Sequence, residues 1–397
     1  MKTVTLREIT LNITDGKHGD CEPAENSGYY FVSCKDVNNG TIDYANARQI
    51  SERAFLETHK RTQLEPNDIL ITNSGTIGRM ALVKDIPETY RTTFQKSVAI
   101  VKPDISVVLP TYLYYKLQNC VTDFVNCSNG SAQKNLLLGT MRKFQIDLHE
   151  DFAEQERLSS ILAAYDNLIE NNQKQIKLLE EAARRLYKEW FVDLRFPGYE
   201  DTPIVDGVPE GWALGELGDI AIDSGKKEKK EHRGQYQYYL PIDCLPKRSL
   251  AYTDKNDITL AESSLVAFMP NDILFGAMRP YFHKVVVARD KGLTRTTCFV
   301  INSKMPAYWA YLLLLLFSKD TVDYATQISV GTTMPYVRWK DFIHMPTLIP
   351  PEEKCDAFQA IVLPIIERIS CLAVSSERLI QARDRLLPKL MSGEIEV

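Results

Sequence analysis

The sequence lacks the short motifs by which many enzyme families are recognised. It has no Gly-x-x-x-x-Gly-Lys-Ser/Thr phosphate loop, no His-Glu-x-x-His zinc motif, no Gly-x-Ser-x-Gly elbow and no Asn/Asp-Pro-Pro-aromatic motif of amino-methyltransferases. None of the six histidines recurs at the spacing of the internal repeat described below. We therefore expect a non-catalytic binding protein, with no catalytic residue, no cofactor and no metal site of its own.

The features of metal-binding, secreted and membrane proteins are also scarce. The eight cysteines include no Cys-x-x-Cys pair, so we expect reduced thiols rather than a metal site. The longest apolar run, near Leu312–Phe317, is far shorter than the roughly 20 residues that span a bilayer. The charged N-terminus lacks the apolar core of a signal peptide. We expect a cytoplasmic protein that does not bind a membrane.

The chain has no excess of positive charge. It contains 47 Lys and Arg against 52 Asp and Glu, and no large segment is basic overall. A protein that binds nucleic acid by itself usually presents a cationic surface. If this chain holds DNA, we therefore expect local polar and basic clusters, with partner proteins neutralising many of the phosphates.

What the sequence does contain is an internal repeat. Asn67-Asp68-Ile69-Leu70 returns as Asn271-Asp272-Ile273-Leu274, and Arg91-Thr92-Thr93 returns as Arg295-Thr296-Thr297, each roughly 200 residues later. Apolar heptads follow each copy. The order is globular, helical, globular, helical, and we predict the four segments 1–150, 151–198, 199–348 and 349–397.

The two helical segments carry apolar residues three and four positions apart, and such a seam requires a partner. Two seams in one chain most simply bury each other, so we predict a long antiparallel two-helix coiled coil between the globular domains. Docking of each helix on its own globular region or on another protein is the alternative. The expected helix-pairing residues are Leu158, Leu162, Tyr165, Ile169, Ile176, Leu179 and Leu186 in the first seam and Phe358, Val362, Ile365, Ile369, Leu372, Leu379 and Leu386 in the second.

Two residues interrupt these seams. Asn172 is either a tolerated polar residue or a group that sets the pairing register. Pro364 predicts a bend in the second helix or a late start of that helix.

The fold class that we predict is mixed α/β (α+β), with two similar domains related by a pseudo-twofold repeat. The Ser74-Gly75-Thr76-Ile77-Gly78 segment lacks the ending of a phosphate loop, so a tight hairpin is expected there. Short strands are expected at 69–72, 80–83, 98–101, 273–275, 285–288 and 298–301, and helices at 110–119 and 306–317.

The loops of the two copies differ, and two modules with one scaffold and unlike loops are suited to binding two unlike surfaces. Asn, Gln, Arg and Lys read base edges in the major groove, and Ser, Thr and Lys anchor phosphates. Each such residue alone is more simply a solvated side chain, but the clusters indicate DNA binding. The candidates are Lys17, His18, Lys35, Asn38, Asn73, Arg79, Ser131, Gln133, Lys134 and Asn135 in the first copy, and Lys227, Lys229, Lys230, Arg233, Tyr236, Arg279, Tyr281, His283, Lys284 and Arg338 in the second.

Several stretches stand in a definite order along the chain. Glu154-Gln155-Glu156-Arg157-Leu158 opens the first helical segment, Tyr187-Lys188-Glu189-Trp190-Phe191 closes it, and Pro209-Glu210-Gly211-Trp212 follows. In this order and spacing they resemble the specificity subunits of type I restriction–modification systems over essentially the whole chain. The second helical segment departs from that pattern, because Pro350-Pro351 is not followed by a Glu-Gln pair.

The resemblance implies two target-recognition domains, each reading one half of a bipartite, asymmetric site on double-stranded DNA, with the coiled coil setting the spacer. It implies as partners two DNA adenine methyltransferase subunits, which bind S-adenosylmethionine, and restriction/translocase subunits, which use ATP and Mg²⁺. The alternatives are a tandem-module scaffold that binds proteins and an enzyme with one active site on one module. Steep weakening of binding by salt would separate DNA binding from the scaffold.

Overall fold

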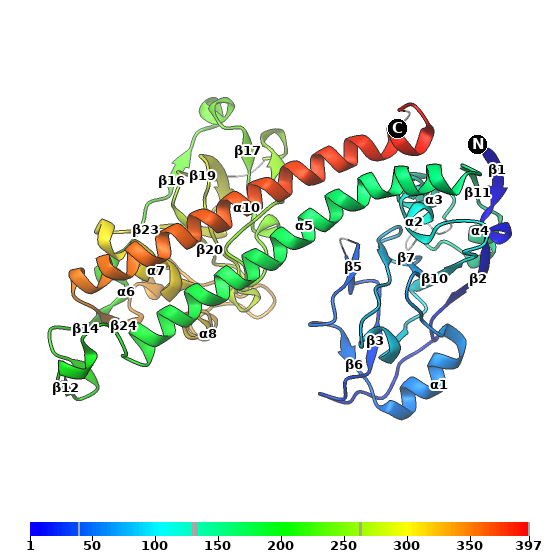
Figure 1. The fold of residues 1–397 in the computed structure, drawn as a ribbon. Coiled ribbons are helices and arrows are strands. Elements are labelled where there is room, and N and C mark those ends of the chain that lie inside the picture. The colour runs from blue at the N-terminus through cyan, green and yellow to red at the C-terminus, as the bar shows by residue number, and fades with distance from the viewer. Residues whose placement is uncertain (39, 129, 131–133, 262–263, 396–397) are drawn as a thin grey trace. The chain divides into compact units, whose positions relative to one another are not determined.

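A computed structural model (Figure 1) describes residues 1–38, 40–128, 130, 134–261 and 264–395. The fold is mixed α/β, as predicted. The chain forms two compact units: unit 1 comprises residues 1–167 and 380–397, and unit 2 comprises residues 168–379. The long helices α5 (Phe152–Tyr187) and α10 (Glu352–Ser392) each contribute one part to unit 1 and the other part to unit 2.

Unit 1 is built on an antiparallel sheet of order β2-β10-β7-β8. Alternate residues of a strand point to opposite faces, so Ile69 and Ile71 pack with Tyr112 and Leu113 on one face, whereas Leu70 packs in a second core on the other. The strands are β2 (Thr10–Asp15), β7 (Ile69–Thr72), β8 (Met80–Leu82) and β10 (Val98–Pro103).

Smaller sheets and short helices complete unit 1. The parallel pair β3–β9 lies in the sheet β6-β3-β9, and two antiparallel pairs join β1 to β11 and β4 to β5. These strands are β1 (Lys2–Thr5), β3 (Tyr30–Val32), β4 (Val37–Asn38), β5 (Thr41–Ile42), β6 (Arg48–Gln49), β9 (Thr92–Phe94) and β11 (Gln145–Leu148). The helices are α1 (Glu52–Thr62), α2 (Pro110–Asn119), α3 (Val121–Asn126) and α4 (Leu138–Lys143).

Unit 2 repeats the strand order of unit 1. Its sheet β15-β23-β20-β21 matches β2-β10-β7-β8 strand for strand, and all of its pairs are antiparallel. The strands are β15 (Ala221–Asp223), β20 (Ile273–Gly276), β21 (Val285–Val287) and β23 (Cys298–Ser303). The last pair of each sheet, β7–β8 or β20–β21, is a hairpin, and we predicted the one in unit 1, where Ile71 lies opposite Met80.

A second sheet of unit 2 has the order β16-β19-β22-β17-β18, and its β17–β22 pair is parallel like β3–β9. Its strands are β16 (Lys226–Glu228), β17 (Tyr238–Tyr239), β18 (Asn256–Asp257), β19 (Leu265–Phe268) and β22 (Gly292–Arg295). Two further pairs are formed by β12 (Ile204–Val205) with β13 (Val208–Pro209) and β14 (Ala213–Glu216) with β24 (Pro346–Ile349). The helices are α6 (Leu217–Ile220), α7 (Trp309–Leu316), α8 (Lys319–Gln327) and α9 (Trp339–Phe342).

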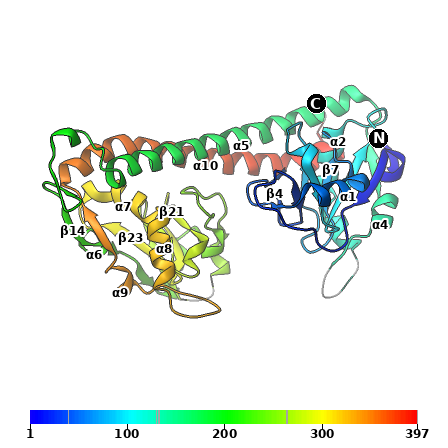
Figure 2. The ribbon, with the colours of Figure 1, turned by 90° about the horizontal axis from the view of Figure 1, so that it is seen from below.

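Helices α5 and α10 lie beside each other within each unit, in both views (Figures 1 and 2). In unit 1, Leu158 and Leu162 of α5 share a core with Leu390 of α10. In unit 2, Trp190 and Phe191, which follow α5, contact Phe358 near the start of α10 at ring-centroid distances of 5.5 and 4.7 Å. The early part of one helix therefore meets the late part of the other, which is an antiparallel arrangement in each unit.

Most of the expected helix-pairing residues are buried. Tyr165, Leu179, Leu186, Ile365, Leu379 and Leu386 are half-buried, and the other eight are buried. Asn172 donates from Nδ2 to Ser375 Oγ at 3.3 Å within unit 2. Of the two alternatives at Pro364, the late start is wrong, because α10 begins at Glu352 and continues through Pro364, and the bend stays a prediction. The Pro364 side chain is exposed, so the helix loses one backbone hydrogen bond there without a clash in the core.

Length and composition would allow α10 to cross a membrane. A packed helix of a globular core passes the same test, and Phe358, Val362 and Ile369 of α10 are buried inside unit 2. The apolar window of α10 is 33% buried, so burial accounts for part of its apolar composition.

Candidate nucleic-acid interface

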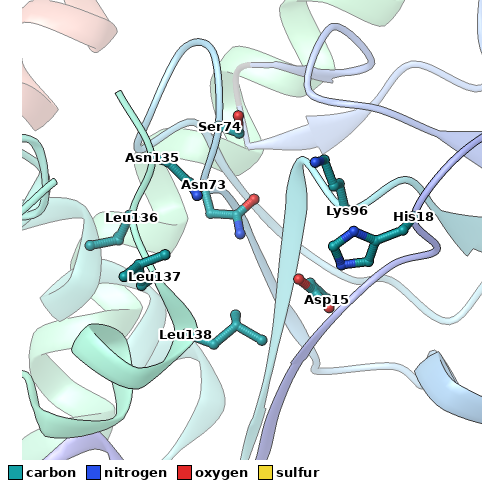
Figure 3. A pocket seen from close by; sticks show the side chains of 9 residues that line it. All are labelled: Asp15, His18, Asn73, Ser74, Lys96, Asn135, Leu136, Leu137 and Leu138. Atoms are coloured by element: carbon teal, nitrogen blue, oxygen red, sulfur yellow. The ribbon is translucent and has the colours of Figure 1, made fainter. Parts of the chain in front are cut away.

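A cavity of about 440 Å³ lies where β7 ends in unit 1 (Figure 3). It combines two exposed basic or imidazole side chains, one carboxylate and two amides with an apolar wall. The lining residues are Asp15, His18, Asn73, Ser74, Lys96, Asn135, Leu136, Leu137 and Leu138. These residues come from four segments that are distant in sequence, and the sheet brings them together.

The backbone holds Asn73 from both sides. Its N–H donates to Ser97 O at 3.0 Å, and its carbonyl accepts from Leu136 N–H at 2.8 Å. The next residue, Ser74, forms a β-bridge with Asn135. This part of the cavity is therefore a fixed strand end and not a free loop.

The opposite wall depends on a close approach of two backbones at Gly16. A Cβ at this position would stand 1.9 Å from Phe94 O, so only glycine fits without a shift. The following residue, Lys17, donates from its N–H to Phe94 O at 2.8 Å, and Lys96 N–H donates to Lys17 O at 3.0 Å. These bonds place His18 and Lys96 at the cavity.

We expect Gly16→Ala to destabilise unit 1 by about 2 kcal/mol, since extra atoms in a closely packed position typically cost 1–3 kcal/mol. Hydrogen exchange at the Lys17 amide, whose bond to Phe94 O should be lost, reports the change locally. Gly139→Ala is the matched control, because a Cβ there meets nothing within 4 Å. Equal exchange rates in the two variants and the parent chain would contradict the steric argument.

The side-chain oxygen of Asn73 has no hydrogen-bond partner among the described residues. The residue is 4% exposed, and its Oδ1 is buried with no hydrogen bond from any described residue. In Figure 3 the amide faces Asp15, His18 and Lys96 across the cavity. Asp15 is engaged by an ion pair with Arg61. An unpaired buried oxygen costs free energy, of the order of 1–3 kcal/mol, so packing alone does not favour an amide here.

The other candidates of unit 1 lie at several surfaces. Lys134 and Asn135 are exposed, and Asn135 lines the cavity. Lys35 is exposed, and its carbonyl accepts from Asn38 Nδ2 at 2.7 Å. Arg79 is exposed and donates to Cys34 O at 3.5 Å. Ser131 and Gln133 lie outside the described residues.

The equivalent place in unit 2 has the same backbone and a different chemistry. Ala277 occupies the position of Asn73: its N–H donates to Thr297 O at 2.9 Å, and its carbonyl accepts from Val337 N–H at 3.0 Å. The neighbouring β-bridge joins Met278 to Tyr336. Where unit 1 presents two amides and a hydroxyl, unit 2 presents a methyl group, a thioether and a phenol ring.

Two of the predicted residues near β16 in unit 2 have structural partners. Tyr236 is buried and donates from its hydroxyl to Glu228 Oε2 at 2.7 Å, and burial raises its pKa to about 12. Arg233 donates to Ala261 O at 2.7 Å. Lys227 and Lys229 are exposed, and the side chain of Lys230 lies outside the described part of the chain. Of this group, Lys227 and Lys229 are therefore the side chains that lie open to a ligand.

Around β20 and β21, too, some candidate residues have structural partners and others are exposed. His283 bonds to Phe317 O at 3.0 Å, Lys284 donates to Ile242 O at 2.7 Å, and burial lowers the pKa of both. Arg279 donates to Thr333 O at 3.2 Å. Tyr281 is exposed, and Arg338 is exposed but paired with Asp341 at 2.5 Å.

Sequence reasoning missed Asp15, Lys96 and the segment Leu136–Leu138. No local pattern marks them. Asp15 and Lys96 reach the cavity through the pairing of β2 with β10 and of Lys17 with Gln95, and Leu136–Leu138 reach it through the bonds of this segment to Asn73 and Ser74. Across the described residues, no group of three or more His, Cys, Asp or Glu side chains is arranged to hold a metal ion.

Comparisons with known proteins agree with the fold. A family model for the type I restriction modification DNA specificity domain matches residues 15–181. The MjaIX specificity subunit of Methanocaldococcus jannaschii is 28% identical over 392 residues, covering 92% of this chain and 87% of that protein. The HindI specificity subunit of Haemophilus influenzae is 21% identical and covers 99% of both chains. The solved S subunit from M. genitalium shares the fold with a TM-score of 0.58 at 14% identity, over 98% of this chain and 95% of that one.

Proposed function

The chain belongs to the specificity subunits of type I restriction–modification systems, and on that premise we propose that its two units read the two halves of a bipartite, asymmetric DNA site. The chain itself is the non-catalytic recognition subunit of the enzyme. Each unit presents its own polar and apolar groups to base edges, while exposed lysines contact phosphates.

One observation carries this proposal. Units 1 and 2 have the same strand order, but equivalent positions at the end of β7 and β20 carry unlike side chains. Where unit 1 has Asn73, Ser74 and Asn135, the equivalent positions of unit 2 hold Ala277, Met278 and Tyr336. A duplicated scaffold with unlike contact residues is suited to an asymmetric site, whereas like residues would favour a palindrome.

Helices α5 and α10 would set the spacing between the half-sites. Each is one continuous helix that contributes to both units. A paired helix is stiff, and both units must meet the groove at the correct rotation, since about 10.5 base pairs make one turn. Under this proposal the unread spacer follows from helix length.

The proposed partners supply what this chain lacks. We propose two DNA adenine methyltransferase subunits with S-adenosylmethionine, and restriction/translocase subunits that use ATP and Mg²⁺. Partner surfaces would also provide positive charge, because this chain carries a formal net charge of −5. We place the assembly in the cytoplasm, with no contact to a membrane.

The proposal is tested by co-expressing the chain with its methyltransferase subunits and sequencing the methylated sites of the host DNA. The expected result is one asymmetric motif with two read segments and an unread gap of constant length. Binding to duplexes of that motif should weaken steeply between low and high salt. Unselective or salt-insensitive binding would instead support the scaffold that binds proteins.

The modular arrangement predicts separable defects. We expect Lys134→Ala, in unit 1, and Lys229→Ala, in unit 2, each to weaken binding by a few-fold, because each removes one exposed cation near the proposed DNA. Duplexes that end before one half-site show which unit is affected, because they remove the phosphates as well as the bases of that half-site. Such a duplex should mask the change only in the unit that has lost its DNA. If Lys134→Ala and Lys229→Ala both acted through the same half-site, modular reading would be contradicted.

A further inference from the structure

We propose that Asn73 is a specificity-determining residue, whose amide reads the edge of one adenine in the half-site bound by unit 1. The inference rests on the proposed function and deepens it. It follows from a cavity, from a buried amide oxygen that has no donor in the described part of the chain, and from the comparison with the same strand end in unit 2.

The comparison with Ala277 excludes a structural need for an amide at this position. Both residues follow the equivalent strand, β7 or β20, and both make the same two backbone hydrogen bonds to neighbouring segments. Unit 2 forms this strand end with a methyl side chain, so the fold does not require a polar one. Asn73 nevertheless keeps Oδ1 buried and without a donor among the described residues.

The state of the amide points to a ligand that brings both a donor and an acceptor. Oδ1 lacks a donor, and Nδ2 has no hydrogen-bond partner in the described part of the chain. The terminal torsion of asparagine is broad, so a modest rotation can turn both atoms toward the cavity. Adenine offers N6–H as the donor and N7 as the acceptor on one edge, which an asparagine side chain contacts in a bidentate manner.

Other DNA groups fit less well. A phosphate and the O6/N7 edge of guanine offer only acceptors, which would leave Oδ1 unpaired. Lys96 and His18, both exposed at the same cavity, are better suited to those acceptors. We infer that these two side chains contact the backbone beside the adenine that Asn73 reads, with Leu137 on the apolar wall.

The test uses the full-length chain assembled with its methyltransferase subunits, without a methyl donor, and a library of random duplexes. In Asn73→Ala, the preference at one A·T pair of the unit 1 half-site should fall by roughly 5- to 150-fold, the range for one bidentate contact. All positions read by unit 2 should stay unchanged. Asn12→Ala, at an exposed asparagine of β2, is the matched control and should leave every preference intact.

Two base analogues at that position identify the contact. Purine without the 6-amino group and 7-deazaadenine should each weaken binding of the parent chain and have no further effect on Asn73→Ala. If the preference of Asn73→Ala is unchanged, or the lost position is not an A·T pair, or both chains respond equally to the analogues, the inference is overturned. If the parent chain itself showed no sequence selectivity, the proposed function would be contradicted instead.

Asn73→Ala should fold as the parent chain does. Asn73→Ala copies the residue that the same backbone carries in unit 2, and it removes an unpaired buried oxygen. The variant should therefore melt at the same temperature as the parent chain or higher. A clear loss of thermal stability would show that Asn73 is structural and would overturn the assignment.

Discussion

Leu162→Lys should unfold unit 1 or destabilise it by more than about 3 kcal/mol. Leu162 of α5 is fully buried and shares a core with Leu158, Leu390 and Met391. The substitution removes apolar contacts that typically contribute 2–5 kcal/mol when a leucine is truncated, and it forces an ammonium group into an apolar site. Urea unfolding followed by hydrogen exchange in the sheet of unit 1 measures the loss.

The same helix offers a control of the same residue type. Leu168, six residues later, is 51% exposed, so Leu168→Lys should change stability by no more than about 0.5 kcal/mol. Similar urea midpoints for the two variants would show that α5 does not pack against α10 in unit 1 as the buried residues indicate. Selective loss of unit 1 with unit 2 intact would agree with the two compact units.

Glu377→Ala should destabilise unit 2 by about 3 kcal/mol, because it removes a carboxylate from partly buried cations. Glu377 lies on α10, where its oxygens are 2.7 Å from Lys255 Nζ and 3.4 Å from Arg289 Nη2. The Arg289 side chain is only 7% exposed, and its guanidinium carbon lies 4.3 Å from the ring centroid of Tyr252. Without Glu377 this guanidinium would keep its charge in a site from which it cannot reach water.

Thermal unfolding and a double-mutant cycle separate the contribution of the Glu377–Arg289 ion pair to stability from that of the rest of α10. Glu367→Ala is the matched control, since Glu367 is an exposed residue of α10 with no ion pair to any residue that the structure describes. Replacing Arg289 with Met in the Glu377→Ala background should recover much of the lost stability, because an apolar side chain leaves no unpaired charge in the site. Equal melting temperatures for Glu377→Ala and Glu367→Ala would contradict the role assigned to this pair.

Local patterns were sufficient for much of the secondary structure. Strand β7 and helix α2 have the predicted limits, since β-branched runs and an N-terminal proline are strong local signals. The helix expected at 306–317 begins instead with a 3-10 turn at Pro306–Tyr308, and α7 follows. Helix ends depend on a single turn of backbone bonds, which the apolar pattern does not report.

The cavity was only partly within reach of sequence reasoning. Asn73, His18 and Asn135 were found because they belong to polar loops of suitable residue types. Lys96 and Asp15 carry no such signal, and Tyr236 was selected although its ring is buried and its hydroxyl is bonded to Glu228. Exposure and hydrogen bonding depend on segments far away in the chain, so residue type alone cannot separate a contact from a core residue.

The sequence by itself determined the repeat, the α/β character and the two heptad seams, because periodicity and copied motifs are properties of neighbouring residues. Only the tertiary structure decided that each long helix divides between two units and that Asn73 Oδ1 is buried without a donor among the residues that the structure describes. These features arise where strands distant in sequence pair and exclude water. The free energy of such contacts depends on which side chains and backbone groups come together, and a local pattern of residues does not specify this.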